Sequence, residues 1–265
     1  MRKIFVFLGV LAMGILSTNF AQHSFAQPSS ILPGVEIKYN LDNNYFTDEK
    51  IQAEFMAKKD ESLKVYFLET QDNIFFQNDC IQRLRVYEGK KNFDLTYKKR
   101  FKNMSISEGI QELEDHGFTG LEKNYKFEID SKNGEDLLSV SRKEKIKMNA
   151  NISYNNVDEI AVMQAFKENA PKKIQTWNSE NWFNQTISRS QLRGPAIVQT
   201  YVGVFNGEPV DIETWDFNGK VMIELSMKTT QDIAPKIKKI WENQLKDSKF
   251  LSTDQRGKTN FVLFP

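Results

Sequence analysis

Residues 211–225, with the sequence DIETWDFNGKVMIEL, are expected to place two carboxylates opposite each other. Asn218-Gly219 lies between two runs of alternating polar and apolar residues, which predicts a β-hairpin with a two-residue type I′ turn. In that register, Glu213 lies directly across from Glu224. Cross-strand neighbours are only about 4.5–5.5 Å apart, and like charges at that distance are destabilising. A cation between the two carboxylates would remove the conflict, so the hairpin predicts a cation-binding position.

Basic residues gather on the polar faces of the strands predicted in the middle of the chain. Successive side chains of a strand point to opposite faces, so Arg83 and Arg85 share one face of QRLRVY. Lys98 lies on the polar face of FDLTYKKR, and in SVSRKEK either Arg142 or its neighbour Lys143 must share that side. Guanidinium and ammonium groups bind phosphate oxygens, whereas carboxylates bind divalent cations. Together the two sets of charges suit a polyanion accompanied by a metal ion.

The elements that must position these residues are predicted from periodicity and capping residues. Strands are predicted at 35–41, 64–70, 81–87, 93–101, 126–130, 138–146, 196–205, 209–217 and 221–229. Helices are predicted after Thr47 and Ser107 and at 157–168 and 232–246. A meander of about eight strands with a few helices predicts one α+β domain, residues 27–265, built on an antiparallel eight-stranded β-barrel with flanking helices. We expect a loop or lid near 170–195, and a tail, NFVLF, that adds a short strand or packs on the barrel.

Nearly every predicted strand has one apolar face and one charged face. Charged faces usually meet water while apolar faces form the core. The helices, however, also need an apolar surface to cover, and if they cover the outside of the barrel then the charged faces point inward. A barrel lined with charges is costly unless a ligand compensates them. The sequence therefore predicts a charged interior that binds a ligand, and the opposite orientation would exclude it.

The first residues of the chain have the pattern of a secretory signal peptide. Met1-Arg2-Lys3 precedes an apolar run at 4–16, and small residues precede a cleavage point after Ala26, with Ala21 as the second choice. This run is shorter than the roughly 20 residues of a membrane-spanning helix. We therefore expect residues 1–26 to be removed and the protein to be secreted or periplasmic.

Composition excludes several classes of site and partner. Without residues 1–26 the chain has 34 basic and 35 acidic residues, so it has no overall positive field for nucleic acid or an anionic membrane. Cys80 is the only cysteine, which predicts a small buried side chain. His116 is the only histidine after residue 26, which excludes histidine-based zinc sites and Ser-His-Asp triads. Any metal would have oxygen ligands and would be magnesium, manganese or calcium, and no glycine-rich P-loop is present.

The ordered motifs resemble those of the CYTH family, the triphosphate tunnel metalloenzymes. That pattern has Glu-x-Glu-x-Lys on the first strand, then Y-x-D-T, L-R-x-R, L-T-x-K and a late acidic pair. The corresponding stretches here are Glu36-Ile37-Lys38, YFLET ending in Glu69-Thr70, RLR from Arg83 to Arg85, and LTYK from Leu95 to Lys98. Gly34 and Ser226 stand where the pattern has two further glutamates, and Asp211 could replace one of them. The resemblance covers most of the chain between about residues 33 and 229.

The resemblance implies a role for each matching residue. Arg83, Arg85, Lys98 and Arg142 would bind phosphate oxygens. Glu36, Glu213 and Glu224 would bind Mg²⁺ or Mn²⁺. Lys38 would contact phosphate or help to activate water, and is the candidate catalytic residue.

Three functions follow as hypotheses. The first is an exported metal-dependent hydrolase of inorganic triphosphate, short polyphosphate or an organic triphosphate. The second is a non-catalytic binding protein that kept the basic tunnel but lost its metal centre, as the changes at Gly34 and Ser226 favour. The third is a carrier of an acidic small molecule in which WNSENWF forms an aromatic lid. In the first two hypotheses the partner is a small phosphorylated compound, and none of the three involves nucleic acid or a membrane span.

Overall fold

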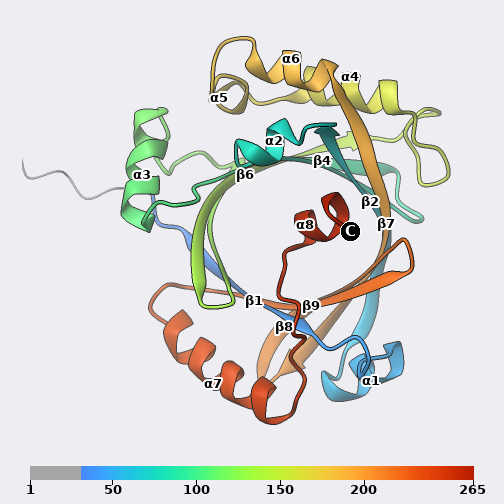
Figure 1. Cartoon of the computed structure of the whole chain (residues 1–265), viewed down its shortest axis with the longest axis vertical. Coiled ribbons are helices and arrows are strands. Elements are labelled where there is room, and N and C mark those ends of the chain that lie inside the picture. Colours follow the sequence, from blue (N-terminus) through green and yellow to red (C-terminus); the bar gives the residue numbers. More distant parts are fainter. Residues whose placement is uncertain (1–30) are drawn as a thin grey trace, which may run out of the picture.

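Nine β-strands close into a barrel in the computed structural model, which describes residues 31–265 (Figure 1). Their order around the barrel is β1-β5-β6-β4-β3-β2-β7-β8-β9. The strands are β1 Gly34–Leu41, β2 Lys58–Thr70, β3 Cys80–Tyr87, β4 Asn92–Arg100, β5 Tyr125–Lys132, β6 Glu135–Lys147, β7 Ser190–Phe205, β8 Glu208–Phe217 and β9 Lys220–Thr229. The α+β barrel fold is confirmed, with nine strands in place of eight. Adjacent strands are antiparallel except β1 and β5, whose parallel pairing brings both strands of the β5–β6 hairpin into the barrel.

Helices surround the barrel, and one short helix lies within it (Figure 1). They are α1 Asp48–Glu54, α2 Ile74–Gln77, α3 Ile106–Asp115, α4 Glu159–Asn169, α5 Lys172–Gln175, α6 Trp182–Ser188, α7 Ala234–Asp247 and α8 Lys258–Leu263. The C-terminal tail was expected to add a short strand or to pack on the barrel. It forms the helix α8, which packs on the inner wall of the barrel. Among residues 31–265, no helix is long and apolar enough to cross a membrane.

The apolar faces of the strands point outward, beneath the helices. Ile37 and Tyr39 of β1 belong to a buried cluster with Trp241 of α7. On the opposite side, Tyr97 of β4 packs against Phe166 of α4, and its hydroxyl donates a hydrogen bond of 2.9 Å to the Phe166 carbonyl oxygen. This orientation is the one on which a charged interior depends.

The segment near residues 170–195 forms α5, α6 and the beginning of β7. Phe183 is 1% exposed in the outer cluster under α4 and α6, and Trp182 contacts Phe75 with 5.4 Å between ring centroids. Trp177 stacks on His116 and also lies in an outer core. These aromatic rings therefore act as packing residues on the outside of the barrel. The segment predicted as a loop or lid thus contains two short helices and the first residues of β7.

The interior has an apolar half as well as a charged half. Val65 of β2 and Trp215 of β8 point inward and form a cluster with Phe261 and Val262 of α8. The expected charged lining is therefore only part of the inner wall, because β2 and β7 turn apolar side chains toward the axis. Helix α8 buries these side chains. The inward-facing charges come from β1, β3, β4, β5 and β6, and from Glu213 and Glu224 of the β8–β9 hairpin.

The register of the β8–β9 hairpin is the one predicted from the sequence. Asn218 and Gly219 have φ values of 53° and 74°, as a type I′ turn requires. Glu213 pairs with Glu224, and Asp211 pairs with Ser226. The predicted signal peptide, residues 1–26, lies outside the described residues.

Candidate functional site

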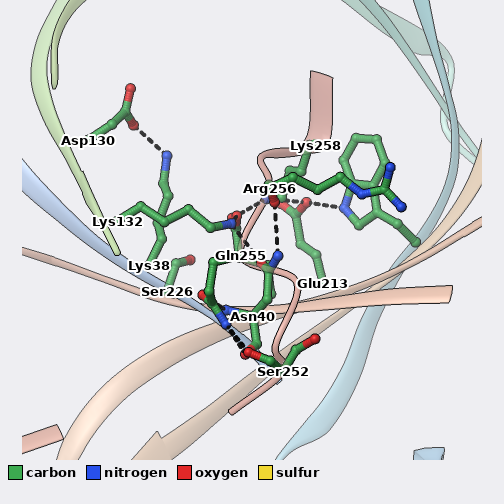
Figure 2. Close-up of polar contacts among 12 residues, drawn as sticks. Lys38, Asn40, Asp130, Lys132, Glu213, Ser226, Ser252, Gln255, Arg256 and Lys258 are labelled. Carbon is green, nitrogen blue, oxygen red and sulfur yellow. Dashed lines mark hydrogen bonds and ion pairs between the residues drawn. The ribbon is translucent and has the colours of Figure 1, made fainter. Parts of the chain in front are cut away.

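The inward-facing charges of β1, β4 and β5 form one connected network. Lys38 makes an ion pair of 2.8 Å with Glu36 on its own strand, and a shorter one with Asp130 of β5 (Figure 2). Lys98 of β4 reaches the other oxygen of Asp130 at 2.5 Å. Burial alone would raise the pKa of Asp130, but the two ammonium groups outweigh it and hold the pKa well below its ordinary value. Asp130 is therefore a carboxylate that links two lysines.

A lysine ammonium lies between the two carboxylates of the β8–β9 hairpin. The Lys258 Nζ atom of α8 is 2.7 Å from Glu213 Oε2 and 2.7 Å from Glu224 Oε1. Glu224 also pairs with Lys132 at 2.8 Å, and Glu213 accepts a 2.8 Å hydrogen bond from Trp215 Nε1. Burial would raise the pKa of Glu224, but Lys258 and Lys132 lower it to about 2. The cation predicted between the facing glutamates is thus supplied by the chain itself.

The two arginines of β3 have few anionic partners. The nearest carboxylate oxygen to Arg85 belongs to Glu213, and lies 3.7 Å from its Nη2 atom. Within residues 31–265, Arg83 makes neither an ion pair nor a side-chain hydrogen bond, and its Nε atom is buried. Burial, followed by the adjacent charge of Arg85, lowers the pKa of Arg83 to about 10, at which it is still a cation at neutral pH. These guanidinium groups can accept an anion without first releasing a close carboxylate.

Comparison with known proteins identifies the fold. No family model and no curated protein matches the sequence. Among solved structures, a Hippeastrum protein, described as a candidate adenylyl cyclase with a dominant triphosphatase activity, matches with a TM-score of 0.55 and 12% identity over 86% of this chain and 94% of its own. A Bacillus halodurans protein, described as a candidate adenylate cyclase, matches with a TM-score of 0.48 and 11% identity over 88% and 98% of the two chains. The barrel has the CYTH-like triphosphate tunnel fold.

The barrel interior contains an acidic group that could hold a metal ion. One carboxylate oxygen from each of Glu36, Glu128 and Asp130 lies within 4.8 Å of the others. Such oxygen donors suit Mg²⁺, Mn²⁺ or Ca²⁺. Each carboxylate already has a lysine partner, which a metal ion would have to replace: Lys38 at Glu36, Lys126 at Glu128, and Lys38 and Lys98 at Asp130.

The structure divides the predicted metal ligands between two places. Glu36 belongs to the acidic group, whereas Glu213 and Glu224 meet at Lys258. Asp130 and Glu128 were missed in the sequence, although they alternate on one face of KFEID. What the sequence did not show is that β5 runs parallel to β1, which places Asp130 beside Glu36.

Arg142 is not among the residues that the tunnel brings together. It lies on the outer face of β6, where it pairs with Glu144 and its guanidinium carbon is 5.3 Å from the Tyr125 ring centroid. Its neighbour Lys143 faces inward instead and pairs with Asp94 at 3.2 Å. The alternation of β6 therefore selects Lys143 as the basic residue on the inner wall.

Glu69, matched to the Asp of the Y-x-D-T motif, accepts hydrogen bonds from the backbone at the start of α2. Its Oε1 atom accepts hydrogen bonds from the backbone N–H groups of Thr70 at 2.8 Å and Phe75 at 3.0 Å, and its Oε2 atom accepts one from Phe76 at 2.8 Å. The carboxylate thereby holds the short helix α2 against the end of β2. It does not join the charge network inside the tunnel.

Proposed function

We propose that this protein binds a triphosphate or a short polyphosphate chain inside its tunnel. The observation that carries the proposal is the contrast between the β3 arginines and the inner lysines. Lys38, Lys98 and Lys258 each have a carboxylate within 2.8 Å, whereas Arg83 has none and Arg85 has one only at 3.7 Å. Guanidinium groups bind phosphate oxygens through paired, charge-assisted hydrogen bonds. A chain of phosphates would compensate both arginines at once.

Solvent reaches the charged half of the tunnel, as entry of a small ligand requires. The side chains of Arg85 and Lys98 remain 19% and 18% exposed, although they point into the barrel. The triphosphatase activity described for the Hippeastrum protein, which has the same fold, supports a ligand of this chemical class.

Metal-dependent hydrolysis is the second candidate function, and the acidic group of Glu36, Glu128 and Asp130 favours it. A magnesium or manganese ion bound there would polarise a phosphoryl group. Arg83 and Arg85 would hold the phosphate oxygens and neutralise their charge. Non-catalytic binding is instead favoured by Lys258, which occupies the position between the other two predicted ligands.

Binding is tested by titrating purified residues 27–265 with tripolyphosphate in a calorimeter, without metal. We expect Arg83→Ala to weaken binding by roughly 10- to 100-fold, since a hydrogen bond to a charged group contributes about 1.5–3 kcal/mol. Arg142→Ala is the matched control, because it removes an arginine from the outer face of the same barrel, and it should leave the affinity unchanged. Absence of binding, or equal affinities for the wild type and Arg83→Ala, would contradict the proposal.

Hydrolysis is tested separately by measuring the phosphate released from tripolyphosphate with Mg²⁺ or Mn²⁺. Release that requires the metal and disappears in Glu36→Gln would support the enzyme. Binding without release would identify a binding protein.

We also propose that the protein is exported, on the basis of the signal-peptide pattern in residues 1–26. Cell fractionation of the full chain and of a chain lacking these residues tests this. Retention of the full chain in the cytoplasm would contradict it.

A further inference from the structure

The C-terminal segment is built into the tunnel wall by apolar contacts. Phe261 and Val262 of α8 are each 3% exposed, and they pack in the cluster that contains Val65 and Trp215. These contacts bury the inner face of β2 and β8. Helix α8 is therefore part of the folded core.

Hydrogen bonds to Asn40 hold the chain that leads into α8. The Asn40 side-chain amide donates to the carbonyl oxygen of Asp254 at 2.9 Å. It also donates to the carbonyl oxygen of Arg256 at 2.9 Å (Figure 2). The backbone N–H of Asn40 donates a hydrogen bond to Gln255 Oε1, and Gln255 Nε2 donates one to the backbone carbonyl oxygen of Asn40, both at 2.9 Å. Asn40 is 1% exposed, so water does not compete for these bonds. Lys258 begins the helix directly after this anchored segment.

The negative charge of the two carboxylates at Lys258 is already compensated by cationic side chains. Its ammonium is 2.7 Å from one oxygen of each glutamate, and Lys132 and Arg85 lie on the far sides of the same two carboxylates. Two carboxylates are thus surrounded by three cationic groups. A divalent ion added to this cluster would meet repulsion in a partly buried place, where charges are poorly screened.

We propose that Lys258 is the resident cation of the Glu213–Glu224 pair, in place of a divalent metal ion. Anchoring of the C-terminal segment keeps the ammonium between the carboxylates, so that Mg²⁺ and Mn²⁺ do not bind there. Removal of the ammonium leaves two facing carboxylates and creates a site for a divalent cation. The inference concerns metal binding without any phosphate compound, so its outcome is separate from that of the proposed function.

The test measures Mn²⁺ binding to residues 27–265 by electron paramagnetic resonance, with Mn²⁺ as the only added ligand. The single variant Glu224→Gln should bind the same number of Mn²⁺ ions as the wild type, and with the same affinity. Lys258→Ala should gain one bound Mn²⁺ per chain, and Lys258→Ala combined with Glu224→Gln should lose it again. Lys246→Ala is the control, because it removes an exposed lysine that pairs with Glu242 at 2.6 Å. It should gain no ion.

Two results would overturn the inference. One is a tenfold or greater loss of Mn²⁺ affinity when Glu224→Gln is made in the wild type. The other is a folded Lys258→Ala protein, verified by circular dichroism, that gains no Mn²⁺. If Lys258→Ala does not fold, the comparison of the wild type with Glu224→Gln decides the question alone.

Discussion

Replacement of Lys258 by methionine should destabilise the fold, because it leaves Glu213 and Glu224 facing each other without their shared cation. Removal of one partner of a buried ion pair typically costs about 3–5 kcal/mol, since the remaining charge is uncompensated. Glu213 keeps its bond from Trp215, and Glu224 keeps Lys132 at 2.8 Å. We therefore expect a loss near the lower end of that range, about 3 kcal/mol.

Urea unfolding of residues 27–265 at pH 7, followed by tryptophan fluorescence, measures this loss. Methionine retains most of the length and apolar surface of the lysine stem, so the variant mainly removes the charge. Lys246→Met is the matched control, because it breaks an exposed i,i+4 pair with Glu242. Such pairs contribute about 0.3–0.5 kcal/mol.

The pH dependence of the loss identifies its electrostatic origin. In the wild type, the pKa of Glu224 is lowered to about 2, so its contribution is present above the unfolded pKa of about 4.3 and is lost as the pH falls toward 2. In Lys258→Met, the ammonium that lowers the pKa of both glutamates is gone, so burial raises each pKa. Protonation of a glutamate then relieves the repulsion between them. The difference in unfolding free energy between the two proteins should therefore shrink from pH 7 to pH 4. A loss no larger than that of Lys246→Met, or one independent of pH, would refute the reasoning.

Three further changes test other contacts. Glu36→Gln should weaken Mn²⁺ binding at the acidic group by tenfold or more in calorimetry, and an unchanged affinity would remove Glu36 from that group. Tyr97→Phe should lower the free energy of unfolding in urea by about 1–3 kcal/mol, because it leaves the buried carbonyl oxygen of Phe166 without its donor. Glu69→Ala should lower it by at least a similar amount, about 1–3 kcal/mol, because three backbone N–H groups lose their acceptor. Glu69→Gln keeps one acceptor oxygen and should lose less, and equal losses would contradict the capping role.

Local rules were enough to predict the strands and their two faces. The Asn218-Gly219 turn sets the pairing of Glu213 with Glu224, because φ must be positive at both turn positions and the period of a strand is two residues. The same period assigned Arg83 and Arg85 to one face. The need of the helices for an apolar surface then indicated which face points inward.

Contacts between distant segments could not be predicted in this way. The parallel pairing of β1 with β5 brings Asp130 beside Glu36. No local sequence pattern predicts this pairing, because it depends on how all the strands close into the barrel. Whether Arg142 or Lys143 faces inward depended on the register of β6 with β4 and β5. Helix α8 is only six residues long, and a short apolar run does not reveal whether it packs inside or outside a sheet.

By itself, the sequence determined that two carboxylates face each other, because turn geometry and strand alternation are local properties. From that repulsion it predicted a cation between them. Only the tertiary structure decided which cation it is. Lys258 reaches the pair because Asn40 and the apolar part of the inner wall hold the C-terminal segment inside the barrel. The hydrogen bonds from Asn40 to Asp254 and Arg256 join residues 214 and 216 positions apart, so no local pattern reveals them.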